Sequence, residues 1–297
     1  MMMKMASPVL NLIFTVGVAL GQDERKAAAG HVFPLDMAVG SVDDQYQGCR
    51  ERMAELVKIE FLPRELNNTT VFGKAWSKIL EKKLHHCDND VLPRNHCIAL
   101  YVYTGDDAYR AFNKADRMGK HNYTNGTYGW YSLQFYLADA VQVLKGKHNN
   151  CNITYRGTDL TFDKNVLNKE VRFGSFTSSS FVPEKTQTFG TKSCFQIKTC
   201  YGAAIHNYSI YDEKEVLIPP YEKFMVTDVL KRSKHCELWC DTVYVLNSTG
   251  IRSDLNCVVA PTPVPTASGQ SPPLHRSDQS LWVTSLGVIT FIQTVTH

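Results

Sequence analysis

The 297-residue sequence has 18 glycines, yet no two of them are separated by a single residue. The G-x-G core of the dinucleotide-binding fingerprint is therefore absent, which excludes a Rossmann grip on a pyrophosphate. Strong charge imbalance is also absent, because the formal net charge is only +3 and is scattered, and this argues against a nucleic-acid partner. No repeat or interior linker divides the chain, so residues 22–258 are expected to form one domain.

The two ends of the chain are typical of targeting segments. Residues 1–21 place a basic residue before an apolar run and finish with small residues, as in a secretory signal peptide. Residues 259–280 form a Pro/Ser/Thr-rich stalk and spacer, with Ala267 and Ser268 as candidate attachment sites. The hydrophobic tail 281–297, although interrupted by polar residues, completes the pattern of a glycosylphosphatidylinositol anchor signal. A secreted protein with a free tail is the alternative.

Nine cysteines behind a signal peptide indicate disulfide bonds. Local spacing suggests Cys87–Cys97 and Cys236–Cys240. A zinc cluster is the rival explanation near the first pair, but the spacing fits no standard zinc pattern and no metal is expected; its residues would be His85, His86, Cys87, His96 and Cys97.

Sequons agree with secretion. They make glycosylation candidates of Asn67, Asn68, Asn122, Asn125, Asn207 and Asn247. A further sequon at Asn152 lies beside Cys151 in a predicted strand and is the one least expected to carry sugar.

The periodicity of apolar residues changes midway along the chain. Helical spacing is seen in 46–57, 71–80, 106–118 and 131–144, while the apolar run 98–103 fits either a strand or part of a helix. From Asn152 onward the period is two, and strands are predicted at 152–156, 168–173, 176–181, 194–200, 215–218, 223–230 and 241–246. Helices followed by strands predict an α+β fold.

The segment 211–220 sets two carboxylates, Glu213 and Glu215, at the mouth of an apolar strand. In an extended chain they would point to one face, about 6.5–7 Å apart, with Lys214 facing away. Two like charges that close are costly unless a cation lies beside them. A solvated strand edge explains most such triplets, so the triplet alone does not predict a site.

Two further segments give the triplet a context. Tyr155-Arg156-Gly157 ends one alternating run, and Ser178-Ser179-Ser180 ends another. In this order the three segments resemble the arginine, serine and glutamate signature of the vertebrate extracellular mono-ADP-ribosyltransferases, in a match that covers roughly residues 35–258. The resemblance implies a helical N-terminal part packed on a two-sheet β core with a central NAD-binding cleft. It also implies the disulfides Cys49–Cys257 and Cys151–Cys200. Together with the two local pairs, these leave Cys194 without a partner.

The resemblance implies an enzyme that transfers ADP-ribose from NAD or NADP to arginine side chains of acceptor proteins and releases nicotinamide. The acceptors would be met at the cell surface, and a monomer would be attached to the membrane only through its lipid anchor. Two alternatives are an NAD glycohydrolase, in which water replaces arginine, and a surface glycoprotein whose site has become silent.

Roles for individual residues follow from the same resemblance. Arg156 would hold the phosphates of NAD through its planar fork, with Gly157 beside the nicotinamide amide. Ser178 would bond the nicotinamide ribose and hold Glu215 in place. Phe189 would stack on the nicotinamide ring, although an ordinary core position explains it nearly as well.

The two glutamates would divide the chemistry. Glu215 would stabilise the oxocarbenium character that develops when nicotinamide departs, and no general acid is needed because the pyridinium leaves as a neutral molecule. Glu213 would orient the incoming guanidinium and accept its proton, since a protonated guanidinium is a poor nucleophile.

Overall fold

The computed structural model describes residues 31–261, except for 68, 83, 85, 86, 88–90, 147–149 and 235–237. The predicted signal peptide, most of the stalk, the tail and the anchor candidates Ala267 and Ser268 lie outside the described residues, as do Asn68 and Cys236. Among the described helices, none combines the length and the apolar character needed to cross a membrane.

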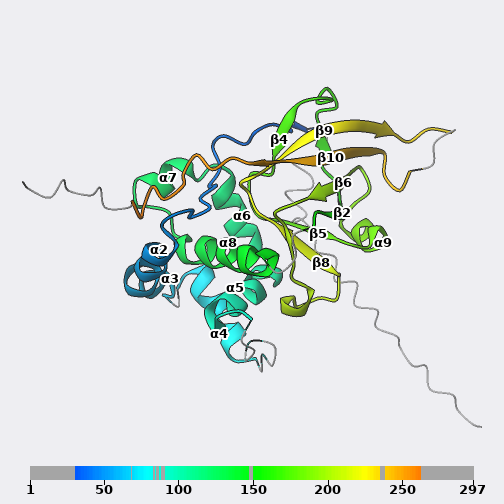
Figure 1. The fold of residues 1–297 in the computed structure, drawn as a ribbon. Helices are drawn as coiled ribbons and strands as arrows, with labels where there is room; N and C mark the ends of the chain where they lie inside the picture. The colour runs from blue at the N-terminus through cyan, green and yellow to red at the C-terminus, as the bar shows by residue number, and fades with distance from the viewer. Residues whose placement is uncertain are drawn as a thin grey trace, which may run out of the picture. The chain divides into compact units, whose positions relative to one another are not determined.

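Helices fill the first half of the described chain, as the spacing of apolar residues predicts (Figure 1). They are α2 (Arg50–Leu56), which continues as a π-helix (Val57–Phe61) into α3 (Leu62–Glu65), then α4 (Val71–Leu80), α5 (Arg94–Thr104), α6 (Tyr109–Arg117), α7 (Lys120–Thr124) and α8 (Tyr131–Gly146). The ambiguous run 98–103 belongs to α5, in which every residue from His96 to Tyr103 is buried. A helix buried on all sides has no amphipathic period, which is why its spacing did not identify it.

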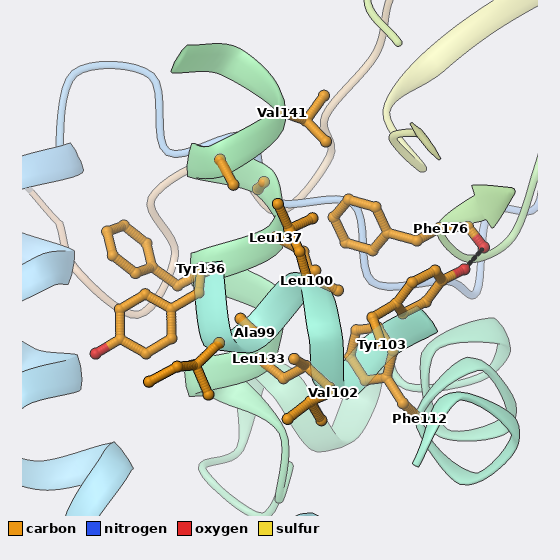
Figure 2. Packing of buried hydrophobic residues seen from close by; sticks show 14 of the residues in the cluster. Ala99, Leu100, Val102, Tyr103, Phe112, Leu133, Tyr136, Leu137, Val141 and Phe176 are labelled. Carbon is orange, nitrogen blue, oxygen red and sulfur yellow. Dashed lines mark hydrogen bonds between the residues drawn. The ribbon is translucent and has the colours of Figure 1, made fainter. Parts of the chain in front are cut away.

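Helices α5 and α8 form the centre of the larger hydrophobic core, and their side chains interdigitate in Figure 2. Phe176, which immediately precedes a strand of the sheet, packs against Tyr103 of α5 and stacks with Phe112 of α6. The Tyr103 hydroxyl also donates a 2.9 Å hydrogen bond to the Phe176 carbonyl. The helical core therefore fixes the start of the strand that carries Ser178.

Strands follow from Asn152 onward at the predicted places, together with two short helical segments that were not predicted, α9 and the 3₁₀ turn after it. They are β2 (Asn152–Thr158), β4 (Glu170–Arg172), β5 (Thr177–Ser180), α9 (Pro183–Thr186), a 3₁₀ turn (Gln187–Phe189), β6 (Ser193–Thr199), β8 (Glu215–Ile218), β9 (Glu222–Lys231) and β10 (Thr242–Ile251). Three two-residue strands and a second 3₁₀ turn were not predicted, namely β1 (Val32–Phe33), β3 (Thr161–Phe162), β7 (Ala203–Ala204) and the turn His206–Tyr208. Segments of two or three residues are too short for the periodicity of apolar residues to identify them.

The strands are arranged in the order β4-β9-β10-β6-β2-β5-β8-β7, and β1 pairs separately with β3. Strand β2 pairs with β6 over seven residues but with β5 only through Tyr155 and Ser180. The order therefore consists of a five-stranded part and a three-stranded part joined by one pairing. This is the form that the expected two-sheet core takes, and the junction lies where the candidate site residues gather.

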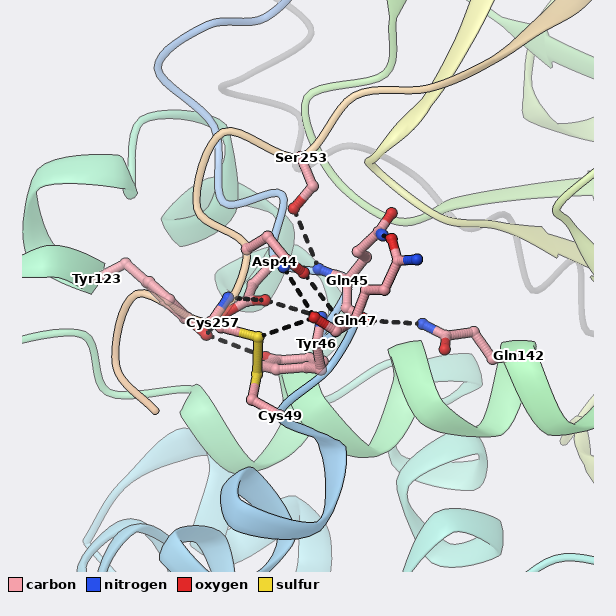
Figure 3. Close-up of a disulfide and its surroundings, with 10 residues drawn as sticks. Asp44, Gln45, Tyr46, Gln47, Cys49, Tyr123, Gln142, Ser253 and Cys257 are labelled. Atoms are coloured by element: carbon pink, nitrogen blue, oxygen red, sulfur yellow. Dashed lines mark hydrogen bonds between the residues drawn. A yellow bond between two sulfur atoms is a disulfide. The ribbon is translucent and has the colours of Figure 1, made fainter. Parts of the chain in front are cut away.

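The two ends of the domain are joined near α2. The predicted disulfide Cys49–Cys257 is confirmed, and Figure 3 shows Asp44 and Tyr46 beside it, with Tyr123 reaching in from α7. The buried Asp44 carboxylate accepts hydrogen bonds from the backbone N–H groups of Tyr46 and Cys257 and from the Tyr123 hydroxyl. Closing a loop of 208 residues removes unfolded-state entropy equivalent to about 5 kcal/mol in the chain-entropy account.

Three further disulfides are present, and one prediction is wrong. Cys151–Cys200 and Cys87–Cys97 are confirmed, and the second bond removes both thiols from any zinc site. Cys240 does not pair with Cys236, because it bonds to Cys194, which had been left without a partner. Short spacing misled the prediction, because the pairing of β6 with β10 brings Cys194 opposite Val243. Cys240 lies only three residues before Val243.

Candidate active site

A cavity of about 420 Å³ opens at the junction of β2 and β5, within the size range of small-molecule sites. Its lining comes from α5, α6, β2, β5, α9 and the segment before β8. All six predicted site residues line this one cavity, namely Arg156, Gly157, Ser178, Phe189, Glu213 and Glu215. Residues that are up to 59 positions apart in the sequence therefore meet in space, as the resemblance implies.

Arg156 lies at the inner part of the cavity, next to Ser178. One guanidinium nitrogen (Nη1) donates a 2.6 Å hydrogen bond to the Ser178 carbonyl, which orients the fork. Burial lowers the pKa of Arg156, and nearby Tyr103 and Glu215 oppose that shift. A cation partly removed from water in this way favours an anionic ligand, because such a ligand would restore the lost solvation.

Glu215, the first residue of β8, is the deepest carboxylate of the cavity and is only 4% exposed. The Ser209 hydroxyl donates a 2.8 Å hydrogen bond to its Oε2 atom. Burial raises the pKa of Glu215, while the Ser178 and Ser209 hydroxyls and the charge of Arg156 oppose that shift. Ser209 was not predicted as a site residue, because it precedes the glutamates in a loop without a recognisable motif.

Glu213 enters the same cavity by a backbone path different from the one expected. Strand β8 begins only at Glu215, and Lys214 has a positive φ of 50°, so the triplet is a turn and not an extended strand. The turn still directs both glutamates into the cavity, while the exposed Lys214 pairs with Asp212 at 3.0 Å. Burial and the charges of Glu215 and Asp106 raise the pKa of Glu213 to about 7, and Lys185 opposes the shift.

The segment 180–185 holds this turn in place. Three consecutive carbonyls of the turn accept hydrogen bonds from it: Asp212 from the Lys185 ammonium, Glu213 from the Ser180 hydroxyl and Lys214 from the Phe181 N–H. The position of the Glu213 side chain is therefore set by β5 and α9. Ser180 is the last residue of the predicted Ser-Ser-Ser motif, and Lys185 lies outside every motif.

Gly157 is required by packing. A side chain on Gly157 would bring its Cβ to 2.5 Å from the Thr186 carbonyl oxygen and 2.6 Å from that of Gly190. A Cβ on Gly190, whose φ is 132°, would lie 2.2 Å from the Asp159 nitrogen. These two glycines let the end of β2 approach the 186–190 segment, which places Phe189 in the cavity lining.

The basic face of α6 was missed by the sequence analysis. Arg110, Lys114 and Arg117 all line the cavity, at the i, i+4 and i+7 positions of one helix face. Asn113 lies among them, with its Oδ1 atom buried and without a hydrogen-bond partner in the described structure. Three cations facing one cavity are suited to the two phosphates of a dinucleotide, and their helical spacing could have indicated this role.

A cavity with a basic wall, a buried carboxylate and a second carboxylate nearer its mouth defines a class of protein that binds an anionic ligand and stabilises a developing cation. Comparison with known proteins makes the assignment specific. A model of the NAD:arginine ADP-ribosyltransferase family matches residues 35–242. The chain therefore belongs to this family.

Similar individual proteins agree with the family. NAD(P)(+)--arginine ADP-ribosyltransferase 1 of Gallus gallus is 34% identical over 200 residues, a match that covers 65% of this chain and 64% of that protein. Ecto-ADP-ribosyltransferase 5 of Mus musculus is 33% identical, with 68% and 70% covered. A mutant of the eukaryotic mono-ADP-ribosyltransferase ART2.2, solved in complex with NAD, is 29% identical with a TM-score of 0.63, and the match covers 76% of this chain and 98% of that one.

Proposed function

We propose that this protein transfers ADP-ribose from NAD to arginine side chains of proteins and releases nicotinamide. The observation that carries the proposal is the convergence of Arg156, Glu215 and Glu213 in one cavity, with Glu215 buried and Glu213 nearer the solvent. The family membership of the chain and the relatives named as arginine ADP-ribosyltransferases support it. The ART2.2 complex with NAD supports NAD as the substrate.

The basic residues would bind and orient NAD. Arg156 and the α6 cations Arg110, Lys114 and Arg117 would neutralise the two phosphates of NAD. Ser178, which lies between Arg156 and Glu215, would bond the nicotinamide ribose through its hydroxyl. Phe189 would lie against the nicotinamide ring. The donor set fits NAD because it offers cations for the phosphates and a buried carboxylate for the ribose.

The chemical step would break the bond between ribose C1′ and the nicotinamide nitrogen, and its electron pair would leave with the nicotinamide. The Glu215 carboxylate would stabilise the positive charge that develops on the ribose, in a site where the low dielectric strengthens this interaction. A guanidinium nitrogen would then form the new bond to C1′, and Glu213 would accept its proton. Water in place of the guanidinium gives NAD hydrolysis as the competing reaction.

The direct test of this function uses the purified ectodomain, NAD labelled in the adenine and agmatine, a small guanidino compound. We expect labelled ADP-ribosyl-agmatine and nicotinamide in equal amounts, with little free ADP-ribose. Nicotinamide and free ADP-ribose without any agmatine adduct would instead make this chain an NAD glycohydrolase. No consumption of NAD would make it a silent relative.

The transfer reaction should fall as the pH drops below about 7. Glu213, whose pKa is raised to about 7, becomes protonated there and loses both its charge for the guanidinium and its ability to accept a proton. Initial rates with saturating NAD and agmatine, measured from about pH 5.5 to about pH 9, check this expectation. The residual activity of Glu213→Gln should not fall in this way at acidic pH. A fall with the same midpoint in that variant would mean that another group causes the pH dependence.

We also propose that the protein is extracellular and anchored through glycosylphosphatidylinositol. The four disulfides, the name of the Mus musculus relative and the targeting segments read from the sequence support this. Candidate glycosylation sites are exposed at Asn67, Asn122, Asn125, Asn207 and Asn247, whereas Asn152 is half-buried.

Phosphatidylinositol-specific phospholipase C should release the protein from the surface of expressing cells, as measured by flow cytometry. Retention while a known anchored control is released would contradict the anchor, and so would secretion of all the protein into the medium. We also propose that the released ectodomain is a monomer, which light scattering would check.

A further inference from the structure

Asp106 lies in the short connection between α5 and α6, at the outer part of the catalytic cavity. Its side chain is exposed, and it lines the same cavity as Glu213. The Tyr211 hydroxyl donates a 2.7 Å hydrogen bond to its Oδ2 atom. Tyr211 precedes Glu213 by two residues, so the segment that carries Glu213 also holds Asp106 in position. This contact connects the helical half of the domain to the turn of the two glutamates.

Asp106 differs from the other acidic residues at the cavity mouth. Asp107 pairs with Lys78 at 2.7 Å, and Asp212 pairs with Lys214 at 3.0 Å and with Lys185 at 3.7 Å. Within the described ranges, no ion pair involves Asp106. A carboxylate can accept about four hydrogen bonds, and the Tyr211 hydroxyl occupies one of these positions. Asp106 therefore keeps both its charge and free acceptor positions toward the cavity.

The electrostatics of the cavity mouth favour a cationic ligand there. The charged groups that act on Glu213 are Glu215, Asp106 and Lys185, of which only Lys185 favours its ionised form. Holding Asp106 and Glu213 in one cavity is therefore unfavourable without a ligand. A cation placed between them would remove this repulsion.

A second, smaller cavity of about 90 Å³ adjoins the first, and Asp106 and Tyr211 line both. The Asp106–Tyr211 pair is therefore the shared wall of the two cavities. Glu215 is buried at the inner end, where the ribose would react, while Asp106 is at the end open to solvent. An acceptor side chain that enters from solvent would pass Asp106 before it reaches Glu213.

We propose that Asp106 is a second carboxylate for the acceptor, so that the incoming guanidinium binds between Glu213 and Asp106. This inference rests on the proposed arginine transfer. A guanidinium is planar and has five N–H donors, so one edge can pair with Glu213 while another reaches Asp106. A lysine ammonium is a compact point charge, so it cannot bridge two separated carboxylates in one fixed geometry as a guanidinium can. Asp106 thus acts as a specificity-determining residue for guanidino acceptors.

The test compares Asp106→Asn with the matched control Asp107→Asn, which makes the same charge change one residue away in a side chain that does not line the catalytic cavity. Steady-state kinetics are measured with agmatine and NAD varied separately. For Asp106→Asn we expect the KM for agmatine to rise about tenfold while the KM for NAD stays within about twofold, since one charged hydrogen bond to the acceptor is lost. Asp107→Asn should match the wild type in both constants.

The pH profile supplies a readout that a purely structural role would not move. Asp106→Asn removes one of the two charges that raise the pKa of Glu213. The fall in the transfer rate at acidic pH should therefore shift to lower pH. Asp107→Asn should leave the pH of this fall unchanged. Thermal melting of both variants checks that they are folded.

The outcomes separate this inference from the proposed function. Wild-type protein that transfers to agmatine, together with an Asp106→Asn variant whose KM for agmatine and pH dependence are unchanged, would overturn the role of Asp106 alone. An equal rise in the KM for NAD would also overturn it, because the effect would then not be specific to the acceptor. Wild-type protein without any transfer to agmatine would overturn the proposed function and the inference with it.

Discussion

Replacing Glu215 by glutamine should abolish both ADP-ribosyl transfer and NAD hydrolysis, with a loss of about 10³-fold or more in kcat. Both reactions require nicotinamide to leave, and in the proposed mechanism the charge of the Glu215 carboxylate stabilises the cation that forms. Glutamine has almost the same shape and can still accept the hydrogen bond from Ser209, so the loss would come from the missing charge. Nicotinamide release, followed by chromatography with and without agmatine, measures both activities.

The same substitution should not destabilise the fold. Burial raises the pKa of Glu215, so the ionised form is costly in the folded protein, and a neutral side chain of the same size relieves that cost. The melting temperature at neutral pH is therefore expected to equal or exceed that of the wild type. Substantial turnover in a folded Glu215→Gln variant would show that another residue carries the chemistry.

Replacing Glu213 by glutamine should separate the two reactions. Transfer to agmatine should fall by about 10²–10⁴-fold, as expected for the loss of a general base, while slow NAD hydrolysis should remain. Glu215 still supports the departure of nicotinamide, and water does not need a carboxylate that binds guanidinium. The measurement is the ratio of ADP-ribosyl-agmatine to free ADP-ribose at equal NAD consumption. Glu184→Gln, an exposed glutamate outside the cavity lining, is the control.

Other outcomes for Glu213→Gln have definite meanings. A parallel loss of both activities in a folded variant would mean that Glu213 and Glu215 titrate and act as one coupled pair, which their mutual electrostatic effect allows. An unchanged rate of transfer would mean that the Glu213 carboxylate takes no part in the reaction.

The sequence predicted which residues come together better than it predicted the backbone that brings them together. Glu213 and Glu215 were expected on one face of an extended strand, yet they share a cavity because Lys214 adopts a positive φ within a turn. That turn depends on hydrogen bonds from Ser180, Phe181 and Lys185, which are distant in sequence. Side-chain periodicity carries no information about contacts of this kind.

Cysteine pairing and the basic face of α6 show the same limit. Cys194 and Cys240 are 46 residues apart and meet because β6 and β10 lie side by side, whereas local spacing favoured Cys236. Arg110, Lys114 and Arg117 do lie on one helix face by their spacing. Their direction toward the cavity, however, depends on how α6 packs against the sheet. The order of strands and helices was readable, but the long-range contacts that orient them were not.

The account is tested most directly with two acceptor peptides that are identical except for one residue, arginine in the first and lysine in the second. After incubation with the ectodomain and NAD, mass spectrometry with fragmentation that preserves the adduct reports whether and where ADP-ribose is attached. We expect modification of the arginine peptide at the arginine side chain and none of the lysine peptide. Equal modification of both peptides, or of neither while NAD is consumed, would contradict the transfer of ADP-ribose to arginine.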